Sequence, residues 1–302
     1  MTDAPLSHRV GTVALAGRPN VGKSTLLNRL LGEKLAITSP KPQATRHKVL
    51  GILTGPDYQA LFLDTPGLME KARDELDRRM VARAEEALKE ADVAVLLVEP
   101  RPPEAADRDL AARVGAFAKK VVLAVNKIDT VPADARKGLL EAHRATGNFV
   151  ESLVLSALTG EGADALREAV VRHLPPGEPL YPADQLTDRD DRFLAAEVLR
   201  EKIYELYGEE IPYDTAVEIE EYREARPEEG RNKDYIRAVI YVNKESQKPI
   251  LIGKAGQALK QLGAAARREI EALLERPVFL EVWVKARPRW RKDPGFLKQI
   301  GY

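Results

Sequence analysis

The sequence predicts an α/β domain, built on a mostly parallel sheet with helices on both faces, followed by a smaller α+β domain. In the first 174 residues, short β-branched segments alternate with amphipathic segments, which is typical of a parallel sheet. Three prolines within 175–179 then exclude a continuing helix or a central strand. Beyond them the predicted order becomes α-β-β-α-α-β, so we expect domains at 1–174 and 189–302, joined by a linker at 175–188.

The expected elements place the candidate functional residues. The strands of the first domain are predicted at 12–16, 49–53, 60–63, 93–98, 121–125 and 153–155, and its helices at 25–31, 76–90, 110–118, 133–145 and 163–174. Parallel sheets bind ligands at the carboxyl ends of their strands, so functional residues should follow these strands. The second domain is predicted to have a helix at 192–206, strands at 215–222, 236–242 and 278–284, and two short helices within 250–274.

Composition limits the class of protein. Of the 302 residues, 44% are hydrophobic and 31% are charged, which supports packed cores and argues against disorder. Apolar runs such as 93–98 are far shorter than the roughly 18 residues of a membrane span, and no secretory signal is visible. Cysteine is absent, which excludes disulfides and zinc–thiolate sites. We expect a cytoplasmic protein, with a peripheral membrane contact left open.

The zero net charge conceals a split along the chain. Residues 181–229 hold 6 basic and 16 acidic side chains, whereas residues 230–302 hold 16 basic and 7 acidic ones, a net charge of +9. A change of this size suggests a basic surface for a polyanion, although an ordinary solvated face would look the same.

Residues 17–24 read G-R-P-N-V-G-K-S, which matches the phosphate-loop pattern G-x-x-x-x-G-K-[ST] between a predicted strand and a predicted helix. The glycines let backbone N–H groups point at phosphate oxygens, and the helix adds its positive N-terminus. Lys23 would supply charge to the β- and γ-phosphates, and Ser24 a hydroxyl ligand for Mg²⁺. The expected phosphate-binding residues are Gly17, Arg18, Pro19, Asn20, Val21, Gly22, Lys23, Ser24 and Thr25.

Two segments indicate guanine as the base. N-K-I-D at 126–129 follows a predicted strand, and the carboxylate of Asp129 could accept both N–H donors on the edge of guanine, whereas adenine would leave it unpaired. Asn126 would tie the strand end to the phosphate loop, and the stem of Lys127 would cover the base. Ser156, Ala157 and Leu158 resemble the S-A-K/L element that places backbone N–H groups near the guanine oxygen, with an ordinary turn as the alternative.

Two further segments match nucleotide-dependent switches. Asp64, Thr65, Pro66 and Gly67 follow a predicted strand and match D-x-x-G. Asp64 would hold Mg²⁺ through water, and the N–H of Gly67 would contact the γ-phosphate. Thr45, between the first helix and the next strand, matches the threonine that binds Mg²⁺ in the GTP state, with a surface threonine as the alternative. The expected metal ligands are therefore Ser24, Thr45 and Asp64, and hydrolysis would release both loops.

The hydrolytic residue is left unassigned. GTP hydrolysis depends on positioning water and neutralising charge, for which Lys23, Thr45 and Gly67 are candidate contacts. Leu68 stands where many GTPases carry a water-orienting glutamine. We therefore expect slow intrinsic turnover, assisted by a partner or a cation. Asn20 stands where cation-activated GTPases place a potassium ligand, although asparagine is also a common turn residue.

The second domain carries a candidate RNA-binding loop. Ile252, Gly253, Lys254, Ala255 and Gly256 lie within the α-β-β-α-α-β order, which resembles a type II KH domain whose G-x-x-G loop clamps about four single-stranded nucleotides. A helix–loop–helix without a ligand is the alternative. Cations after the last strand flank an aromatic residue, a pattern suited to phosphate contact and base stacking, whereas Trp283 is expected in the core. These tail residues are Lys285, Arg287, Arg289, Trp290, Arg291 and Lys292.

Together, the runs at 17–28 (G-R-P-N-V-G-K-S-T-L-L-N) and 40–47 (P-K-P-Q-A-T-R-H), with D-T-P-G, N-K-I-D and I-G-K-A-G-Q, resemble the Era family of bacterial GTPases over nearly the whole chain. The resemblance implies binding to the 3′ end of 16S ribosomal RNA, a role in small-subunit assembly and a peripheral contact with the inner membrane. DNA is not an expected partner.

Two functions remain open on the sequence. One is a GTPase whose nucleotide state gates RNA binding, and the other is an RNA chaperone that uses GTP as a structural ligand and barely hydrolyses it. Leu68 keeps the second open, whereas Asp129 disfavours an ATP-dependent enzyme.

Overall fold

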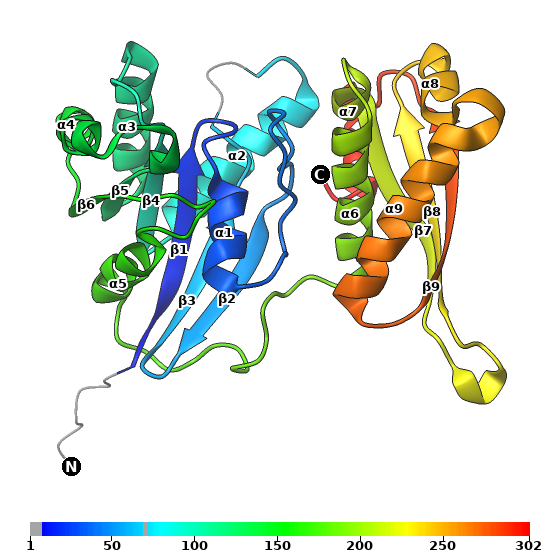
Figure 1. Ribbon diagram of the computed structural model, residues 1–302, viewed down its shortest axis with the longest axis horizontal. Helices are drawn as coiled ribbons and strands as arrows, with labels where there is room; N and C mark the ends of the chain where they lie inside the picture. Colours follow the sequence, from blue (N-terminus) through cyan, green and yellow to red (C-terminus); the bar gives the residue numbers. More distant parts are fainter. Residues whose placement is uncertain (1–7, 69–71) are drawn as a thin grey trace. The chain divides into compact units, whose positions relative to one another are not determined.

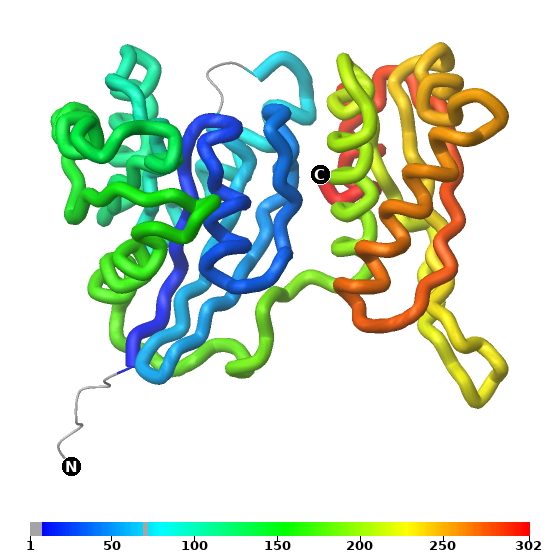
Figure 2. Tube along the Cα trace, viewed as in Figure 1, coloured from blue at the N-terminus to red at the C-terminus, as the bar shows by residue number. Residues whose placement is uncertain are grey.

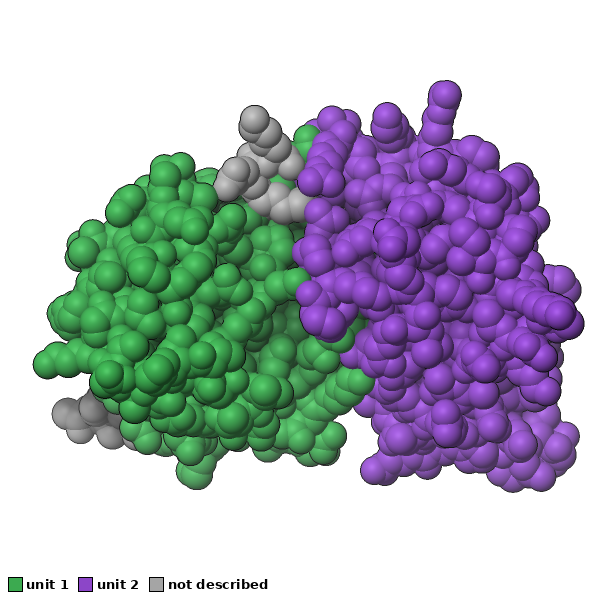
Figure 3. Space-filling model, turned by 45° about the horizontal axis from the view of Figure 1, so that its top comes forward, with its two compact units in different colours: residues 1–38, 45–72, 79–188 green, residues 39–44, 73–78, 189–302 purple. Residues whose placement is uncertain are grey.

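The computed structural model describes residues 8–68 and 72–302. The chain forms two compact units, coloured green and purple in Figure 3. The first consists of residues 1–38, 45–72 and 79–188, and the second of residues 39–44, 73–78 and 189–302. Among the helices that the structure describes, none is both long and apolar enough to cross a membrane.

The first unit is built on a six-stranded sheet with the order β2-β3-β1-β4-β5-β6. All neighbours are parallel except β2 and β3, which form an antiparallel pair. The central strands are continuous apolar runs because helices cover both of their faces. The strands are β1 (Arg9–Gly17), β2 (Val49–Gly55), β3 (Tyr58–Asp64), β4 (Val93–Val98), β5 (Val121–Val125) and β6 (Glu151–Val154).

Helices lie on both faces of this sheet, as the sequence predicts (Figure 1). On one face, Leu88 and Val114 belong to a buried apolar cluster that includes Leu96 and Leu123 of the sheet. The helices α1 and α5 contact each other on the other face. The helices are α1 (Lys23–Leu31), α2 (Glu75–Glu90), α3 (Ala105–Phe117), α4 (Ala133–Arg144) and α5 (Ala163–His173).

The segment 175–188, which we expected as a linker, runs along the first unit. The buried side chain of Gln59 accepts hydrogen bonds from the N–H groups of Leu180 (2.7 Å) and Tyr181 (3.0 Å). Farther along, the N–H of Ile52 donates to the carbonyl of Leu186 at 2.8 Å. The segment is therefore hydrogen-bonded to the first unit along its length and is not a flexible linker.

The second unit is an α+β fold with a three-stranded sheet in the order β7-β8-β9. The strands β7 (Thr215–Arg223) and β8 (Asp234–Val242) are antiparallel, and β9 (Val278–Ala286) is parallel to β8. Figure 2 traces the long connection between β7 and β8, which extends beyond the sheet. The helices are α6 (Asp191–Leu206), α7 (Ile211–Asp214), α8 (Lys248–Ile252), α9 (Gln257–Leu274) and α10 (Pro294–Gln299).

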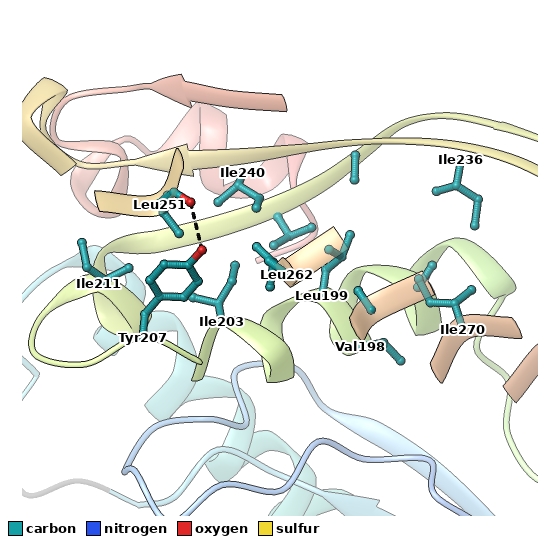
Figure 4. Close-up of a cluster of buried hydrophobic side chains, with 14 of the residues drawn as sticks. Val198, Leu199, Ile203, Tyr207, Ile211, Ile236, Ile240, Leu251, Leu262 and Ile270 are labelled. Atoms are coloured by element: carbon teal, nitrogen blue, oxygen red, sulfur yellow. Dashed lines mark hydrogen bonds between the residues drawn. The ribbon is translucent and has the colours of Figure 1, made fainter. Parts of the chain in front are cut away.

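The core of this unit lies between the sheet and α6, α8 and α9 (Figure 4). Leu199, Ile240 and Leu262 are fully buried there, and the hydroxyl of Tyr207 donates to the carbonyl of Leu251 at 2.9 Å. This confirms the expected α-β-β-α-α-β order. The short helices α7 and α10 are not predicted from the sequence.

Candidate active site

The phosphate loop connects β1 to α1. Gly22 has a φ of 102°, and a Cβ at this position would lie 2.3 Å from the side-chain nitrogen of Asn126. Both the left-handed backbone and the close approach therefore require glycine. As the motif predicts, the loop ends directly at the first residue of a helix, Lys23.

The Lys23 side chain folds back over this loop and is almost fully buried. Its Nζ donates to the carbonyl of Arg18 at 3.1 Å and lies 3.4 Å from that of Gly17. Burial lowers the pKa of Lys23 to about 8, although the nearby Asp64 carboxylate opposes this shift. The ammonium group therefore lies beside the loop where a phosphate would bind.

The three expected metal ligands come together from three separate segments. The hydroxyl of Ser24 donates to Asp64 Oδ2 at 2.6 Å, and it lies 2.8 Å from the hydroxyl of Thr45. Asp64 is fully buried at the end of β3. Two hydroxyls and a carboxylate form a set of hard oxygen donors, which is the ligand type that Mg²⁺ prefers.

The segment after β3 passes close to the phosphate loop. A Cβ on Gly67 would lie 2.6 Å from the backbone nitrogen of Pro19, and the N–H of Leu68 donates to the carbonyl of Gly17 at 3.1 Å. The Leu68 side chain is 5% exposed and belongs to the apolar cluster beneath the sheet. It therefore offers no polar group to orient water.

Asn126 ties the phosphate loop to the predicted base-binding loop. Its side-chain nitrogen donates to the carbonyl of Val21 at 2.8 Å, and its oxygen accepts from the N–H of Ala157 at 2.9 Å. The residue is buried at the end of β5, so both bonds are shielded from water.

Asp129 and Lys127 are held by different partners. The hydroxyl of Ser156 donates to Asp129 Oδ1 at 2.5 Å, which orients the carboxylate expected to read guanine. Lys127 has a left-handed φ of 61°, and its ammonium pairs with Glu99 at 2.9 Å. Glu99 is not predicted from the sequence; it lies just after the carboxyl end of β4.

Asp107, in the first turn of α3, is a second carboxylate that sequence reasoning missed. It accepts from the Glu104 N–H at 2.9 Å and from the Arg101 guanidinium at 2.8 Å, and it lies 3.7 Å from the Arg18 guanidinium. Burial alone would raise the pKa of Asp107, but these donors outweigh burial and hold it below its usual range. The E-x-x-D spacing at 104–107, a capping pattern, was the available signal.

The candidate RNA loop forms a sharp, accessible turn between α8 and α9. Gly253 has a φ of 72°, and a Cβ there would lie 2.6 Å from the Ala258 Cβ, so only glycine fits. Lys254 and Ala255 are exposed at the tip. The loop thus presents backbone and one cation to solvent, as the G-x-x-G pattern predicts.

The prediction for the two tryptophans was wrong. Trp290 is fully buried, and its indole N–H donates to the carbonyl of Asp214 at 2.8 Å, so no base can stack on it. Trp283, expected in the core, is 53% exposed, and Phe279 on the same face of β9 is 56% exposed. The helices cover the opposite face of β9, which reverses the expected roles.

The cations of the C-terminal segment also differ from the expectation of a free basic tail. Arg291 pairs with Asp74 at 2.6 Å and with Asp77 at 3.1 Å and is mostly buried, so its predicted RNA contact is wrong. Four of the five predicted cations remain accessible. These are Lys285, paired with Glu220; Arg287, paired with Asp293 and lying over the Phe296 ring; Arg289; and Lys292.

Comparisons with known proteins identify the family of this chain. A family model described as a 50S ribosome-binding GTPase matches residues 12–127, and a KH-domain model matches residues 210–291. GTPase Era of Geobacter metallireducens is 44% identical over 304 residues, covering 100% of both chains. GTPase Era of Lactobacillus delbrueckii subsp. bulgaricus is 42% identical over 295 residues, which cover 98% of this chain and 96% of the relative.

Two solved structures are similar over nearly the whole chain. A point variant of Aquifex aeolicus Era, bound to GDP and AlF4⁻, has a TM-score of 0.93 and 41% identity, covering 97% of this chain and 99% of that one. An Era complex with MgGDPNP and nucleotides 1506–1542 of 16S ribosomal RNA has a TM-score of 0.92 and 42% identity, covering 98% and 99%. The chain therefore belongs to the Era family of GTPases and is a GTP-hydrolysing enzyme with a C-terminal KH domain.

Proposed function

We propose that this GTPase binds the single-stranded 3′ end of 16S ribosomal RNA, assists assembly of the small ribosomal subunit, and changes its grip on RNA with its nucleotide state. The proposed RNA binding rests on the accessible loop at Gly253–Gly256. The Era complex that holds both MgGDPNP and 16S nucleotides supports the pairing of the two ligands.

We assign nucleotide binding to the residues that the first unit gathers at one edge of its sheet. Residues 17–25 and 64–67 would contact the phosphates, with Lys23 and the N–H of Gly67 neutralising charge on the γ-phosphate. Asn126, Lys127, Asp129 and residues 156–158 would hold the base. We therefore assign residues 1–174 to a nucleotide-binding domain and residues 189–302 to an RNA-binding domain, and residues 175–188 connect the two.

Ser24, Thr45 and Asp64 are the proposed holders of Mg²⁺, since the Ser24 hydroxyl lies within hydrogen-bonding distance of both Thr45 and Asp64. The ion would neutralise charge between the β- and γ-phosphates. The oxygens of these three residues would fix the position of that charge beside Lys23. The MgGDPNP in the Era complex supports this assignment.

Because Leu68 is apolar and buried, the residue after the D-x-x-G motif cannot orient the attacking water. We therefore propose that K⁺ accelerates hydrolysis from a site at Asn20, whose φ of 63° places it in a left-handed turn of the phosphate loop. Single-turnover hydrolysis should be faster in K⁺ than in Na⁺ at equal ionic strength. Equal rates would remove this part of the proposal.

For RNA, the loop residues Ile252–Gly256 would clamp the backbone, with Lys254 contacting a phosphate. Lys285, Arg287 and Arg289 would add phosphate contacts, which predicts affinity that falls steeply with salt. We also propose action in the cytoplasm, with a peripheral contact at the inner membrane, which flotation with anionic vesicles would test.

Phosphate release with and without an RNA of the 16S 3′ end tests the proposed function. We expect the RNA to change the rate at least threefold, whereas an RNA chaperone that uses GTP only structurally would show the same minimal release in both cases. Gly256→Asp should abolish the change in phosphate release that RNA causes, because the added carboxylate repels the RNA phosphates. A Cβ at this position meets no atom within 4 Å, so the substitution displaces no neighbouring group. Gly230→Asp is the matched control, since Gly230 has a similar φ of 78° and equally open surroundings in the β7–β8 connection.

A further inference from the structure

In the loop at 156–161, between β6 and α5, nearly all backbone N–H groups donate hydrogen bonds within the protein. The N–H of Ser156 donates to the carbonyl of Glu161, and the N–H of Gly160 donates to the carbonyl of Ser156. The N–H groups of Thr159 and Glu161 donate to the hydroxyls of Ser156 and Thr159, respectively. The N–H of Ala157 donates to Asn126 Oδ1. In this loop, which lies entirely within the described residues, only the N–H of Leu158 makes no hydrogen bond. The Leu158 side chain is 68% exposed.

Arg29, in the last turn of α1, reaches this loop from a distant part of the chain. Its Nε donates to the carbonyl of Ala157 at 3.3 Å, and a terminal nitrogen donates to the carbonyl of Leu158 at 2.5 Å. The Arg29 Cδ lies 3.5 Å from the position a Cβ would take on Gly160, so the stem also packs along the loop. The rigid guanidinium fork thus holds two successive carbonyls.

These contacts set the direction of the free donor. The carbonyl of Ala157 and the N–H of Leu158 belong to one planar trans peptide unit, in which the two groups point in opposite directions. Since Arg29 draws the carbonyl toward α1, the N–H of Leu158 points away from α1. The loop is also joined to the base-binding residues, because Ser156 donates to Asp129.

We propose that Arg29 is a positioning residue for guanine recognition, which presents the N–H of Leu158 to the 6-oxo group of the base. This rests on the proposed base-binding role of the loop. Guanine has an acceptor at position 6 and adenine has a donor, so a fixed N–H favours guanine. Asp129 would read N1–H and the 2-amino group, so the two residues act on different atoms of the same ring.

Nucleotide analogues separate recognition of the 6-oxo group from recognition of the 2-amino group. We would measure the affinities of wild type and Arg29→Met for GDP, for 6-thio-GDP, whose sulfur is a weaker acceptor at position 6, and for IDP, which lacks the 2-amino group. Arg29→Met should reduce the preference for GDP over 6-thio-GDP by about three- to tenfold, the range of one lost hydrogen bond between neutral groups, since the N–H of Leu158 and the 6-oxo group carry no net charge. The preference for GDP over IDP should stay within about twofold of wild type.

Arg167→Met on α5 is the matched control, because Arg167 is a partly exposed arginine paired with Asp164. Arg29→Lys, which keeps the charge but loses the fork, should give an intermediate preference and serves if Arg29→Met folds poorly. Equal weakening of all three ligands, unchanged preferences, or a wild type that does not distinguish 6-thio-GDP would overturn the proposal. A wild type that does not distinguish IDP would instead count against the assignment of Asp129.

Discussion

Replacing Asn126 by alanine should uncouple the phosphate loop from the base-binding loop. The side chain is 1% exposed and joins the carbonyl of Val21 to the N–H of Ala157 through bonds of 2.8 and 2.9 Å. A buried polar group left without its partner costs about 1–3 kcal/mol. Two such groups, with some relaxation, predict a loss of about 3 kcal/mol in the free energy of unfolding of the first unit.

Urea denaturation without nucleotide measures this loss, and the dissociation rate of a fluorescent GDP measures its effect on binding. We expect the dissociation rate of Asn126→Ala to rise at least tenfold, because both halves of the site lose their common anchor. Asn148→Ala, at an exposed asparagine of the same unit, should match wild type. A loss below about 0.5 kcal/mol with an unchanged dissociation rate would refute this reasoning.

Three further outcomes are expected. Asp107 has a pKa below that of an unfolded aspartate, so its carboxylate stabilises the folded state above about pH 4 and loses this effect as the pH falls further. In thermal melts, the melting temperature of Asp107→Asn should therefore depend less on pH on the acid side than that of wild type. Trp290→Ala should cost about 3–5 kcal/mol in urea titrations, whereas the exposed Trp283→Ala should cost less than about 1 kcal/mol; similar losses would contradict the assigned burial. Leu68→Gln should lower stability by about 2 kcal/mol without faster single-turnover hydrolysis, because the amide would enter an apolar core; a rate gain would contradict its buried position.

Most of the nucleotide site could be predicted because its signals are local. Except for Thr45, which precedes β2, the residues of each nucleotide motif follow a strand of the parallel sheet, so the topology brings them to one edge. The strand limits 93–98 and 121–125 agree with the structure because both are continuous apolar runs in the sheet centre. The approach of Ser24 to Asp64 then follows from the topology, because β1 and β3 are parallel neighbours.

The contacts that escaped prediction depend on which surfaces meet in three dimensions. Arg29 is 128 residues from Ala157, and nothing local marks it as a partner of that loop. The alternation of β9 indicated two faces, but not that the helices cover the face opposite Trp283. The helix α10 has only six residues and begins with Pro294 and Gly295, so it looked like part of a tail.

The coupling between nucleotide and RNA is most directly tested by titrating an RNA of the 16S 3′ end against the full chain loaded with GDPNP or with GDP. We expect the two affinities to differ at least tenfold, because the γ-phosphate contacts at Thr45 and Gly67 exist in only one state. Gly256→Asp should weaken RNA binding in both states, whereas Gly230→Asp should not. Equal affinity of the wild type in the two states would contradict a nucleotide-dependent grip on RNA.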